Sequence, residues 1–428
     1  MSTVECLGRP QCGVFLLPML LVTGLVCSLS RTCGDNAVTA GVTEPTQAPD
    51  WGPAMLTFVV GGSQVWGIGG AGQRASCLLR EDREDPCLDA IQWSPDGRKL
   101  VYQAYNGTWQ ATYLRPRDLS GPPQLLCPIA WDPRMSPDWS LLACNHADTM
   151  EEFAVAARPT IVRMQRPGGQ PDITDLSPLL EGYYPRSERR RNLTVRWSPS
   201  AHLLATCADR WTVLIDVNSR SVLKVEGCRG VPEWSPDGQH LAFTWFPPQE
   251  VTPEGLYVYP APASEIAVIK RNEAGLTNLT NDPRGDRYPK WSPDGRRIAF
   301  LRSETEPGTH PGGDAALPDS HVADGLPTHS FRHPGFIYRQ ELRAIWVMAP
   351  DGTGQRQLSP EVLTDDDFAW SRDGRWIAYK TNKQPPEADS VWVVGLDGAP
   401  PVLVATGFHG IGDIAWRPAM TVSPTKPD

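Results

Sequence analysis

Short apolar runs separated by polar turns recur along the chain from Met55 to Trp416. One unit contains such runs at Tyr288–Trp291, Arg297–Leu301, Ala344–Ala349 and Gln355–Leu358, and the next unit repeats this order after Phe368. Brief apolar runs bounded by turn residues predict β-strands rather than helices. Four antiparallel strands in each repeat are typical of a β-propeller blade.

A five-residue corner, Trp-Ser-Pro-Asp-Gly, follows the first run of the clearest units. Complete copies occupy Trp93–Gly97, Trp234–Gly238 and Trp291–Gly295. Degraded copies begin at Met135, Trp197, Trp370 and Trp416. The chain is therefore a tandem array of one small β unit, and stacked units share one continuous fold.

The two ends of the array complete each other. Trp416 ends a first strand, Asp413–Trp416, and only twelve residues follow it. Before the first corner stand three runs that lack a first strand of their own: Leu56–Val60, Gln64–Gly67 and Ala75–Leu79. We therefore predict an all-β fold, a single β-propeller of seven four-stranded blades whose ring is closed by pairing of the two ends. Six or eight blades would follow if the weak Met135 unit were misread.

Each residue of the corner has a structural task. Tryptophan places a large apolar body between blades, proline presets φ for a turn, aspartate bonds to nearby backbone, and glycine accepts a positive φ. We assign these corner residues to folding and not to chemistry: Trp93, Asp96, Gly97, Trp234, Asp237, Gly238, Trp291, Asp294, Gly295, Trp370, Asp373, Gly374 and Trp416.

The repeat resembles that of the TolB-type β-propeller family, which is built on a Pro-x-Trp-Ser-Pro-Asp-Gly corner. Pro232–Gly238 and Pro289–Gly295 match that pattern in full, and Leu279-Thr280 precedes the second match. The resemblance covers residues 54–418 and implies a WD-like propeller. TolB itself carries an α/β domain before its propeller, and no such segment precedes Leu56 here, so we transfer no site residue from the family.

No motif for catalysis or for a cofactor is present in the sequence. The same repeats occur in prolyl oligopeptidase-type serine hydrolases, which need a Gly-x-Ser-x-Gly elbow in a further domain. The nearest run here, Gly61-Gly-Ser-Gln-Val65, fails at its last position. Phosphate-binding and His-Glu-x-x-His motifs are also missing. We therefore expect no catalytic residue, no cofactor and no hydrolase of that type.

The N-terminus predicts export. Val14–Leu29 is predominantly apolar and follows Arg9, which suits a signal peptide, an uncleaved anchor or, with Cys27, a lipoprotein. The domains we expect are residues 1–30 as signal peptide or membrane anchor, 31–53 as flexible linker, 54–418 as propeller and 419–428 as disordered tail. The location would be periplasmic, extracellular or anchored at the outer face of a membrane.

Seven cysteines follow the apolar segment, and an exported setting permits disulfides. Six of them fall near the ends of second or fourth strands. We predict the pairs Cys77–Cys87, Cys127–Cys144 and Cys207–Cys228; burial as reduced thiols is the alternative.

One long insertion, Ser303–Gln340, holds four of the eight histidines: His310, His321, His329 and His333. With nearby aspartates they are weak candidates for a zinc or copper site, and a polar loop is the alternative. The Asp365–Asp367 cluster has the same two interpretations, with calcium as the ion.

The leading hypothesis is a non-enzymatic binding or scaffold protein of the cell envelope. Second-to-third strand loops and interblade connections emerge on one side of a propeller, here called the loop-rich face, and we expect it to engage a protein or peptide. The net charge of −9 argues against nucleic acid, and we expect a monomer. The alternatives are a propeller enzyme or carbohydrate-binding protein with its site at the central channel, and a metal-dependent sensor.

Overall fold

A computed structural model describes residues 49–70, 73–81, 88–105, 110–149, 158–163, 172–180, 195–208, 211–226, 231–247, 263–271, 275–303, 343–360, 368–381, 389–408 and 410–419. The chain divides into Met1–Gly41 and Val42–Asp428, and every described residue belongs to the second unit. No helix within these ranges is both long enough and apolar enough to cross a membrane. The apolar segment Val14–Leu29 lies outside the described residues.

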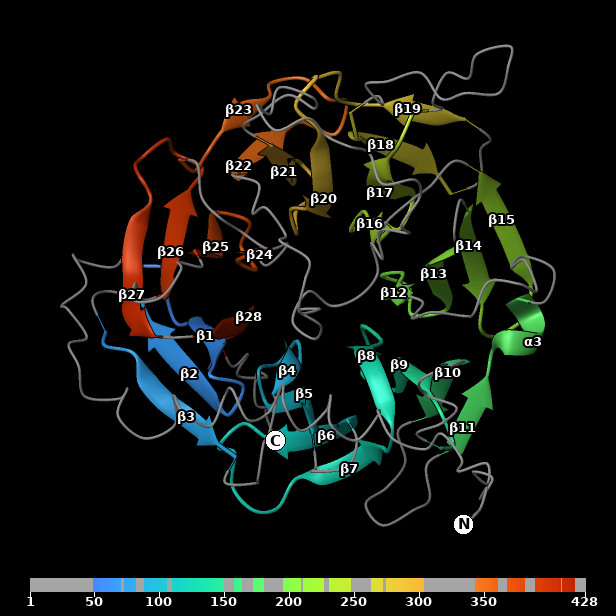
Figure 1. Cartoon of the computed structure of the whole chain (residues 1–428), viewed down its shortest axis with the longest axis horizontal. Helices are drawn as coiled ribbons and strands as arrows, with labels where there is room; N and C mark the ends of the chain where they lie inside the picture. Colours follow the sequence, from blue (N-terminus) through green and yellow to red (C-terminus); the bar gives the residue numbers. More distant parts are fainter. Residues whose placement is uncertain are drawn as a thin grey trace, which may run out of the picture. The chain divides into compact units, whose positions relative to one another are not determined.

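Seven four-stranded antiparallel sheets form a ring of blades (Figure 1). The first three, in ring order, contain the following strands. Blade 1 holds β28 (Ile411–Arg417), β1 (Met55–Val60), β2 (Gln64–Gly69) and β3 (Ser76–Arg80). Blade 2 holds β4 (Asp89–Trp93), β5 (Lys99–Tyr105), β6 (Gln110–Pro116) and β7 (Gln124–Cys127). Blade 3 holds β8 (Ala130–Met135), β9 (Leu141–His146), β10 (Arg158–Arg163) and β11 (Asp172–Asp175), after which comes a short helix, α3 (Ser177–Leu180).

The other four blades follow the same order. Blade 4 holds β12 (Val195–Trp197), β13 (Leu203–Ala208), β14 (Trp211–Asp216) and β15 (Val222–Glu226). Blade 5 holds β16 (Glu233–Trp234), β17 (His240–Trp245), β18 (Glu265–Lys270) and β19 (Leu276–Asn278). Blade 6 holds β20 (Asp286–Trp291), β21 (Ile298–Ser303), β22 (Arg343–Met348) and β23 (Arg356–Gln357). Blade 7 holds β24 (Phe368–Trp370), β25 (Trp376–Thr381), β26 (Asp389–Gly395) and β27 (Val402–Phe408).

The predicted fold is confirmed, including the number of blades and the closure of the ring. β28 pairs antiparallel with β1, so that Leu56 lies opposite Trp416 and Thr57 opposite Ala415. The Thr57 hydroxyl also donates to the Ala415 carbonyl oxygen at 2.7 Å. The weak Met135 unit forms a complete blade, which removes the six- and eight-blade alternatives.

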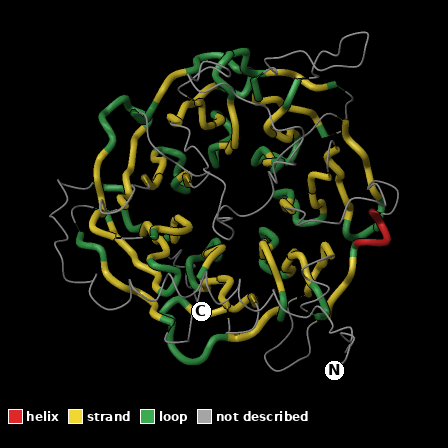
Figure 2. Tube along the Cα trace, viewed as in Figure 1, coloured by secondary structure: helices red, strands yellow, loops and turns green. Residues whose placement is uncertain are grey.

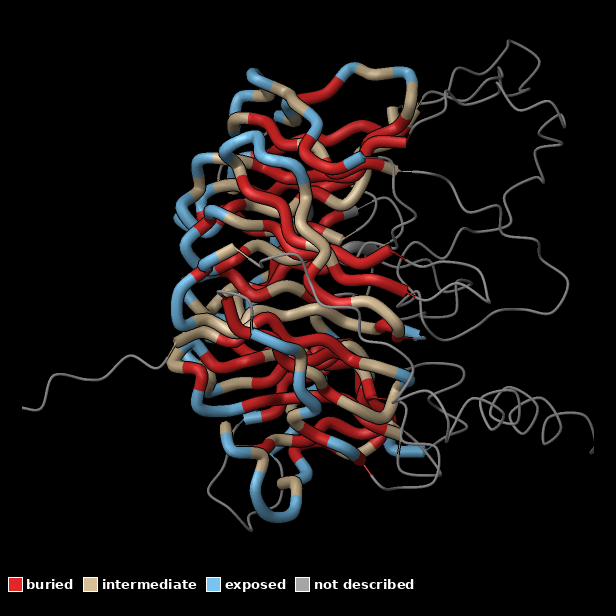
Figure 3. Tube along the Cα trace, turned by 90° about the vertical axis from the view of Figure 1, so that its left-hand side faces the viewer, coloured by how far each residue is buried: buried red, intermediate tan, exposed pale blue. Residues whose placement is uncertain are grey.

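Apolar side chains of neighbouring blades pack against each other and form the core. One cluster joins blade 1, through Leu56 and Phe58, to blade 7, through Val391 and Val404. Another joins blades 5 and 6 through buried side chains of both. The strands are buried along much of their length, and exposed residues gather at the turns (Figure 3). The hydrophobic stabilisation is therefore shared around the ring rather than concentrated in one centre.

The corners form a repeated hydrogen-bonded turn. In the Trp93 corner the Ser94 hydroxyl donates to Asp96 at 2.5 Å and accepts from the Lys99 amide at 2.8 Å. The turn places Gly97 at φ 63°, a conformation that glycine adopts at little cost. Equivalent serine–aspartate bonds occur in the Trp234, Trp291, Trp370 and Met135 corners.

The corner tryptophans also bond to the preceding blade. The indole N–H of Trp197 donates to the Arg134 carbonyl at 2.9 Å, and that of Trp370 donates to the Lys290 carbonyl at 3.0 Å. Trp234 and Trp416 repeat this bond. These indole bonds, here called the tryptophan latch, tie each of these blades to the one before it.

Figure 2 shows the strands in groups around a centre, with the described helix at the rim. The first strand of each blade lies nearest that centre (Figure 1). Since second strands end where third strands begin, the ends of β9 and β17 lie on the loop-rich face with the connections between blades. The corners lie on the opposite face.

Candidate functional site

A surface pocket of about 590 Å³ lies on the loop-rich face of blade 5, beside its connection to blade 6. Its lining residues come from the ends of β17, β18 and β19 and from that connection: Trp245, Pro247, Ala263, Glu265, Asn278, Asn281, Asp282 and Pro283. The lining therefore combines an aromatic ring and prolines with amide and carboxyl groups. A second hollow of about 470 Å³ lies on the corner face, among Arg98, Pro116, Arg117 and Asp118.

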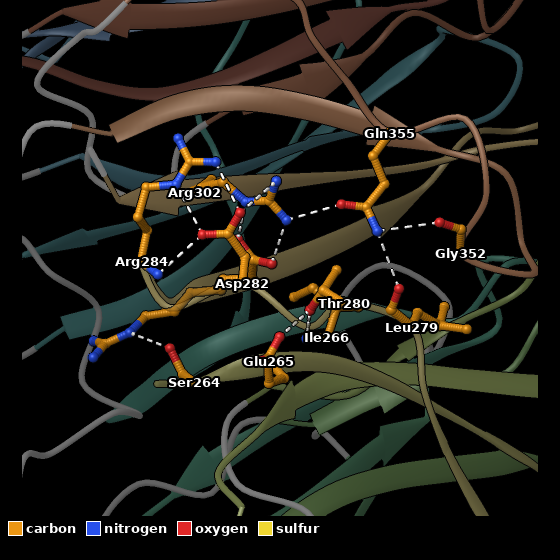
Figure 4. Close-up of polar contacts among 12 residues, drawn as sticks. Ser264, Glu265, Ile266, Leu279, Thr280, Asp282, Arg284, Arg302, Gly352 and Gln355 are labelled. Carbon is orange, nitrogen blue, oxygen red and sulfur yellow. Dashed lines mark hydrogen bonds and ion pairs between the residues drawn. The ribbon is translucent and has the colours of Figure 1, made fainter. Parts of the chain in front are cut away.

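Glu265 is the most unusual group in the first pocket. Only 6% of the residue is exposed, and its carboxylate accepts a hydrogen bond of 2.5 Å from the Thr280 hydroxyl. The Thr280 hydroxyl oxygen in turn accepts from the Ile266 amide at 2.9 Å (Figure 4). Burial raises the pKa of Glu265 to about 7, against the opposing hydrogen bond from Thr280 and with a further contribution from the Asp286 charge. This carboxyl can therefore exchange a proton near neutral pH.

A buried ion pair supports the pocket from blade 6. Arg302 forms two bonds to Asp286, of 2.7 and 2.8 Å, and both side chains are almost completely buried. Burial raises the pKa of Asp286, although the Arg302 guanidinium opposes this shift. Arg302 also lies 3.3 Å from Asp282, and Arg284 makes two bonds of 2.8 Å to the same carboxylate. Both aspartates are thus neutralised by arginine.

Further contacts fix the connection between the two blades. The Arg302 guanidinium donates to Gln355 at 2.9 Å and lies 4.4 Å from the centre of the Trp346 ring. Gln355 donates to the Leu279 carbonyl at 3.2 Å (Figure 4). Gly352 permits this approach, because a Cβ there would lie 2.6 Å from the same carbonyl oxygen. The pocket wall is therefore preorganised by side chains of blade 6.

A second group of charges lies on the first strands of the blades, nearest the centre of the ring (Figure 1). The position just before each corner lies on a first strand, and around the ring it is occupied by Gln92, Arg134, Arg196, Glu233, Lys290, Ala369 and Ala415. Asp132 lies 2.7 Å from Arg134 and 3.7 Å from Arg196, and Arg196 lies 3.3 Å from Glu233. Burial and the nearby Arg134 charge lower the pKa of Arg196. These charges largely compensate one another.

The structure describes only some of the cysteines and none of the insertion histidines that the sequence singled out. Cys127 and Cys144 come together, with their sulfur atoms 4.0 Å apart and unbonded, and Cys77 is an exposed thiol. The side chain of Cys207 and both Cys87 and Cys228 lie outside the described residues. So do the four insertion histidines and the Asp365–Asp367 cluster. Within the described ranges, no three His, Cys, Asp or Glu side chains are grouped to hold a metal.

The reasoning from sequence missed Glu265, Asp286 and Arg302. A local signal exists for Glu265, because it begins an apolar run, Glu265–Lys270, at a strand end where a charge is costly. The pairing of Asp286 with Arg302 has no such signal, since the two residues meet only after β20 and β21 pair.

Comparisons with known proteins agree on the fold and leave the activity open. No family model matches the chain. An uncharacterized peptidase, YuxL, from Bacillus subtilis (strain 168) is 27% identical over 152 residues, which are 35% of this chain and 21% of that protein. The matched part thus spans about a fifth of the length of that relative.

Solved structures with similar backbones include TolB proteins. TolB from Acinetobacter baumannii is 14% identical, with a TM-score of 0.46 over 85% of this chain and 67% of that chain. A putative TolB from Agrobacterium tumefaciens is 18% identical, with a TM-score of 0.41 over 75% of this chain and 95% of that chain. A functionally unknown protein from Desulfotomaculum acetoxidans is 9% identical, with a TM-score of 0.50 over 85% of this chain and 99% of that chain. The chain is a seven-bladed β-propeller whose structural neighbours include TolB proteins.

Proposed function

We propose that this chain is an exported, non-enzymatic binding protein of the cell envelope that engages a protein or peptide through its loop-rich face. The observation that carries the proposal is the Glu265 pocket on that face. Its lining joins an aromatic ring and prolines to a few amide and carboxyl groups, the mixture that is usual for ligand sites. Export is inferred from the apolar segment Val14–Leu29.

The composition of the pocket suits a peptide. Trp245 and Pro247 offer apolar contact area, while Asn278 and Asn281 can each donate to and accept from a peptide backbone. The Glu265 carboxylate accepts from the Thr280 hydroxyl and, when ionised, can also accept from a ligand N–H. Asp282 in the lining is held by Arg284 and Arg302, and such preorganisation lowers the entropic cost of binding.

The test begins with a peptide ligand selected on the wild-type protein, whose dissociation constant is measured by calorimetry. We expect Trp245→Ala to weaken binding by about 10-fold or more, the loss typical of a buried aromatic contact. Asp397→Asn, an exposed turn residue on the opposite face, is the matched control and should bind like the wild type. Unchanged affinity in both Trp245→Ala and Glu265→Gln would remove the pocket from the proposal.

The charges on the first strands support one alternative, a propeller enzyme or carbohydrate-binding protein with its site at the centre of the ring. Arg134, Arg196 and Glu233 converge there from three blades and could bond to sugar hydroxyl or carboxylate groups. Binding of oligosaccharides that is lost in Arg196→Gln and kept in Trp245→Ala would favour this alternative. The reverse pattern would favour the loop-rich face.

A further inference from the structure

A pair of buried thiols lies between blades 2 and 3. Cys127 is the last residue of β7, and Cys144 lies near the end of β9. Both residues are fully buried, and their sulfur atoms are 4.0 Å apart. A disulfide bond is about 2.0 Å long, so an approach of about 2 Å would close it.

A histidine beside the pair makes the two thiols unequal. His146 Nδ1 lies 3.6 Å from the Cys127 sulfur and 3.0 Å from the Pro128 carbonyl oxygen. Since a carbonyl only accepts, this nitrogen carries a proton that can also be directed at the sulfur. Its other nitrogen, Nε2, lies 3.5 Å from Asp148, which is paired with Arg158. The imidazole is therefore placed to hold positive charge next to Cys127.

The electrostatics agree with this geometry. A hydrogen bond from the Cys144 thiol is the largest cause that lowers the pKa of Cys127; burial opposes it and His146 adds to it. The pKa of Cys144 is raised by that same bond, by burial, and by the charges of Cys127 and Asp132. Burial tends to lower the pKa of His146, but its contacts with Cys127 raise it overall. Cys127 is thus the cysteine of the pair that ionises more readily, and Cys144 is the one that keeps its proton longer.

We propose that Cys127 and Cys144 form a peroxide-reactive dithiol that closes to a disulfide linking blade 2 to blade 3. The Cys127 thiolate attacks one oxygen of hydrogen peroxide, so that an S–O bond forms and the O–O bond breaks. The departing hydroxide takes up the proton that Cys127 had released and becomes water. Cys144 then attacks the Cys127 sulfur; the S–S bond forms, the S–O bond breaks, and hydroxide leaves with the Cys144 proton as a second water.

The position of the pair explains why a small oxidant is required. Val101, Leu142 and Val162 surround the sulfurs in an apolar cluster, which keeps bulky reagents out. Both β7 and β9 end at the loop-rich face, so the pair lies close to the ends of its strands. The disulfide would join the outermost strand of one blade to the second strand of the next.

The experiment treats the reduced full-length protein with increasing hydrogen peroxide and maps its peptides without reduction. We expect a cross-linked peptide pair containing Cys127 and Cys144, removed again by a dithiol reductant. Cys144→Ser should stop at a sulfenic acid on Cys127, seen by mass spectrometry as one added oxygen on the peptide that contains Cys127. Cys77→Ser removes an exposed thiol and is the matched control; it should cross-link like the wild type.

His146→Gln separates a directed reaction from mere proximity. It should slow cross-linking at pH 7 by about 10-fold and move the pH midpoint of the rate upward, because the thiolate loses its cationic neighbour. Wild-type protein that leaves Cys127 and Cys144 reduced at a peroxide dose that oxidises Cys77 would overturn the proposal. So would copurifying zinc or copper that blocks the pair until a chelator removes it.

Discussion

The corner face and the pocket at blades 5 and 6 lie on opposite sides of the propeller and are held together by different kinds of contact. Each corner repeats one set of local bonds, such as the Ser94–Asp96 contact and its counterparts around the ring. The pocket depends on Asp286, Arg302 and Gln355, which come from separate strands and turns of blade 6. The corner repeats a local turn, whereas the pocket is made once by side chains that meet only in the folded blade.

The corners therefore serve the stability of every blade, whereas the pocket gives one blade a surface that the others lack. If one corner is lost, similar turns remain in the other blades. The carboxylate of the corner aspartate is also partly open to water. In the pocket, charges are taken out of water and their partners are unique. The cost of an error should therefore be much larger there, although the corner is the more recognisable motif.

Asp286→Ala should have the largest effect on stability. It removes the two-bond partner of the Arg302 guanidinium, which is 3% exposed and keeps only its contacts with Asp282 and Gln355, and breaking a buried pair costs about 3–5 kcal/mol. Asp294→Ala in the corner of the same blade is the matched control. Its side chain is 47% exposed, and its loss should cost only about 1 kcal/mol. Free energies of unfolding are measured in urea. Equal values for the two variants would contradict the expectation that the buried pair contributes more to stability than the corner carboxylate.

Glu265→Gln tests the pocket through the pH dependence of stability. The folded carboxyl has a pKa of about 7, above its unfolded value, so between about pH 4.5 and 7 the native state binds more protons than the unfolded state. The stabilising effect of the protonated form is full below this window and is lost as the pH rises through it. The free energy of unfolding of the wild type should fall by about 1–3 kcal/mol more than that of Glu265→Gln between pH 4.5 and 8.

An exposed carboxyl provides the control for that measurement. Bonds from Ser120 lower the pKa of Asp118, so its titration lies below this window. Asp118→Asn should therefore follow the wild-type pH profile between pH 4.5 and 8. Parallel profiles for the wild type and Glu265→Gln would show that Glu265 is ionised throughout and would remove its role as a neutral-pH proton acceptor.

The sequence predicted the features that are local. The corner from Trp93 to Gly97 is five adjacent residues, and closure followed from an unfinished strand at Trp416 and unpartnered strands before Trp93. Thr57, opposite Ala415 in the structure, lies in one of those unpartnered strands. To predict such features, it is enough to know the local sequence pattern and to require that the edges of a sheet are paired.

The pocket could not be predicted in the same way, because its contacts join distant positions. Gln355 reaches the Leu279 carbonyl across many residues of chain, and only Gly352 leaves space for that approach. The raised pKa of Glu265 depends on burial and on Asp286, neither of which is visible in the residues beside it. The tryptophan latch is predictable only in part. The tryptophans can be found in the sequence, but the carbonyl groups that accept their hydrogen bonds belong to the preceding blade.

The smallest expected effect comes from breaking one such latch. Trp197→Phe keeps an aromatic ring between blades 3 and 4 but removes the 2.9 Å bond to the Arg134 carbonyl. Trp291 occupies the same corner position, yet its buried indole nitrogen has no hydrogen-bond partner in the described part of the chain. Trp197→Phe should therefore cost about 1 kcal/mol more than Trp291→Phe, the usual net value of one hydrogen bond. Urea midpoints of the two variants give this difference directly. An equal or larger loss in Trp291→Phe would mean that the corner tryptophans act through ring packing alone, and that even the repeated face of this propeller does not depend on its latch.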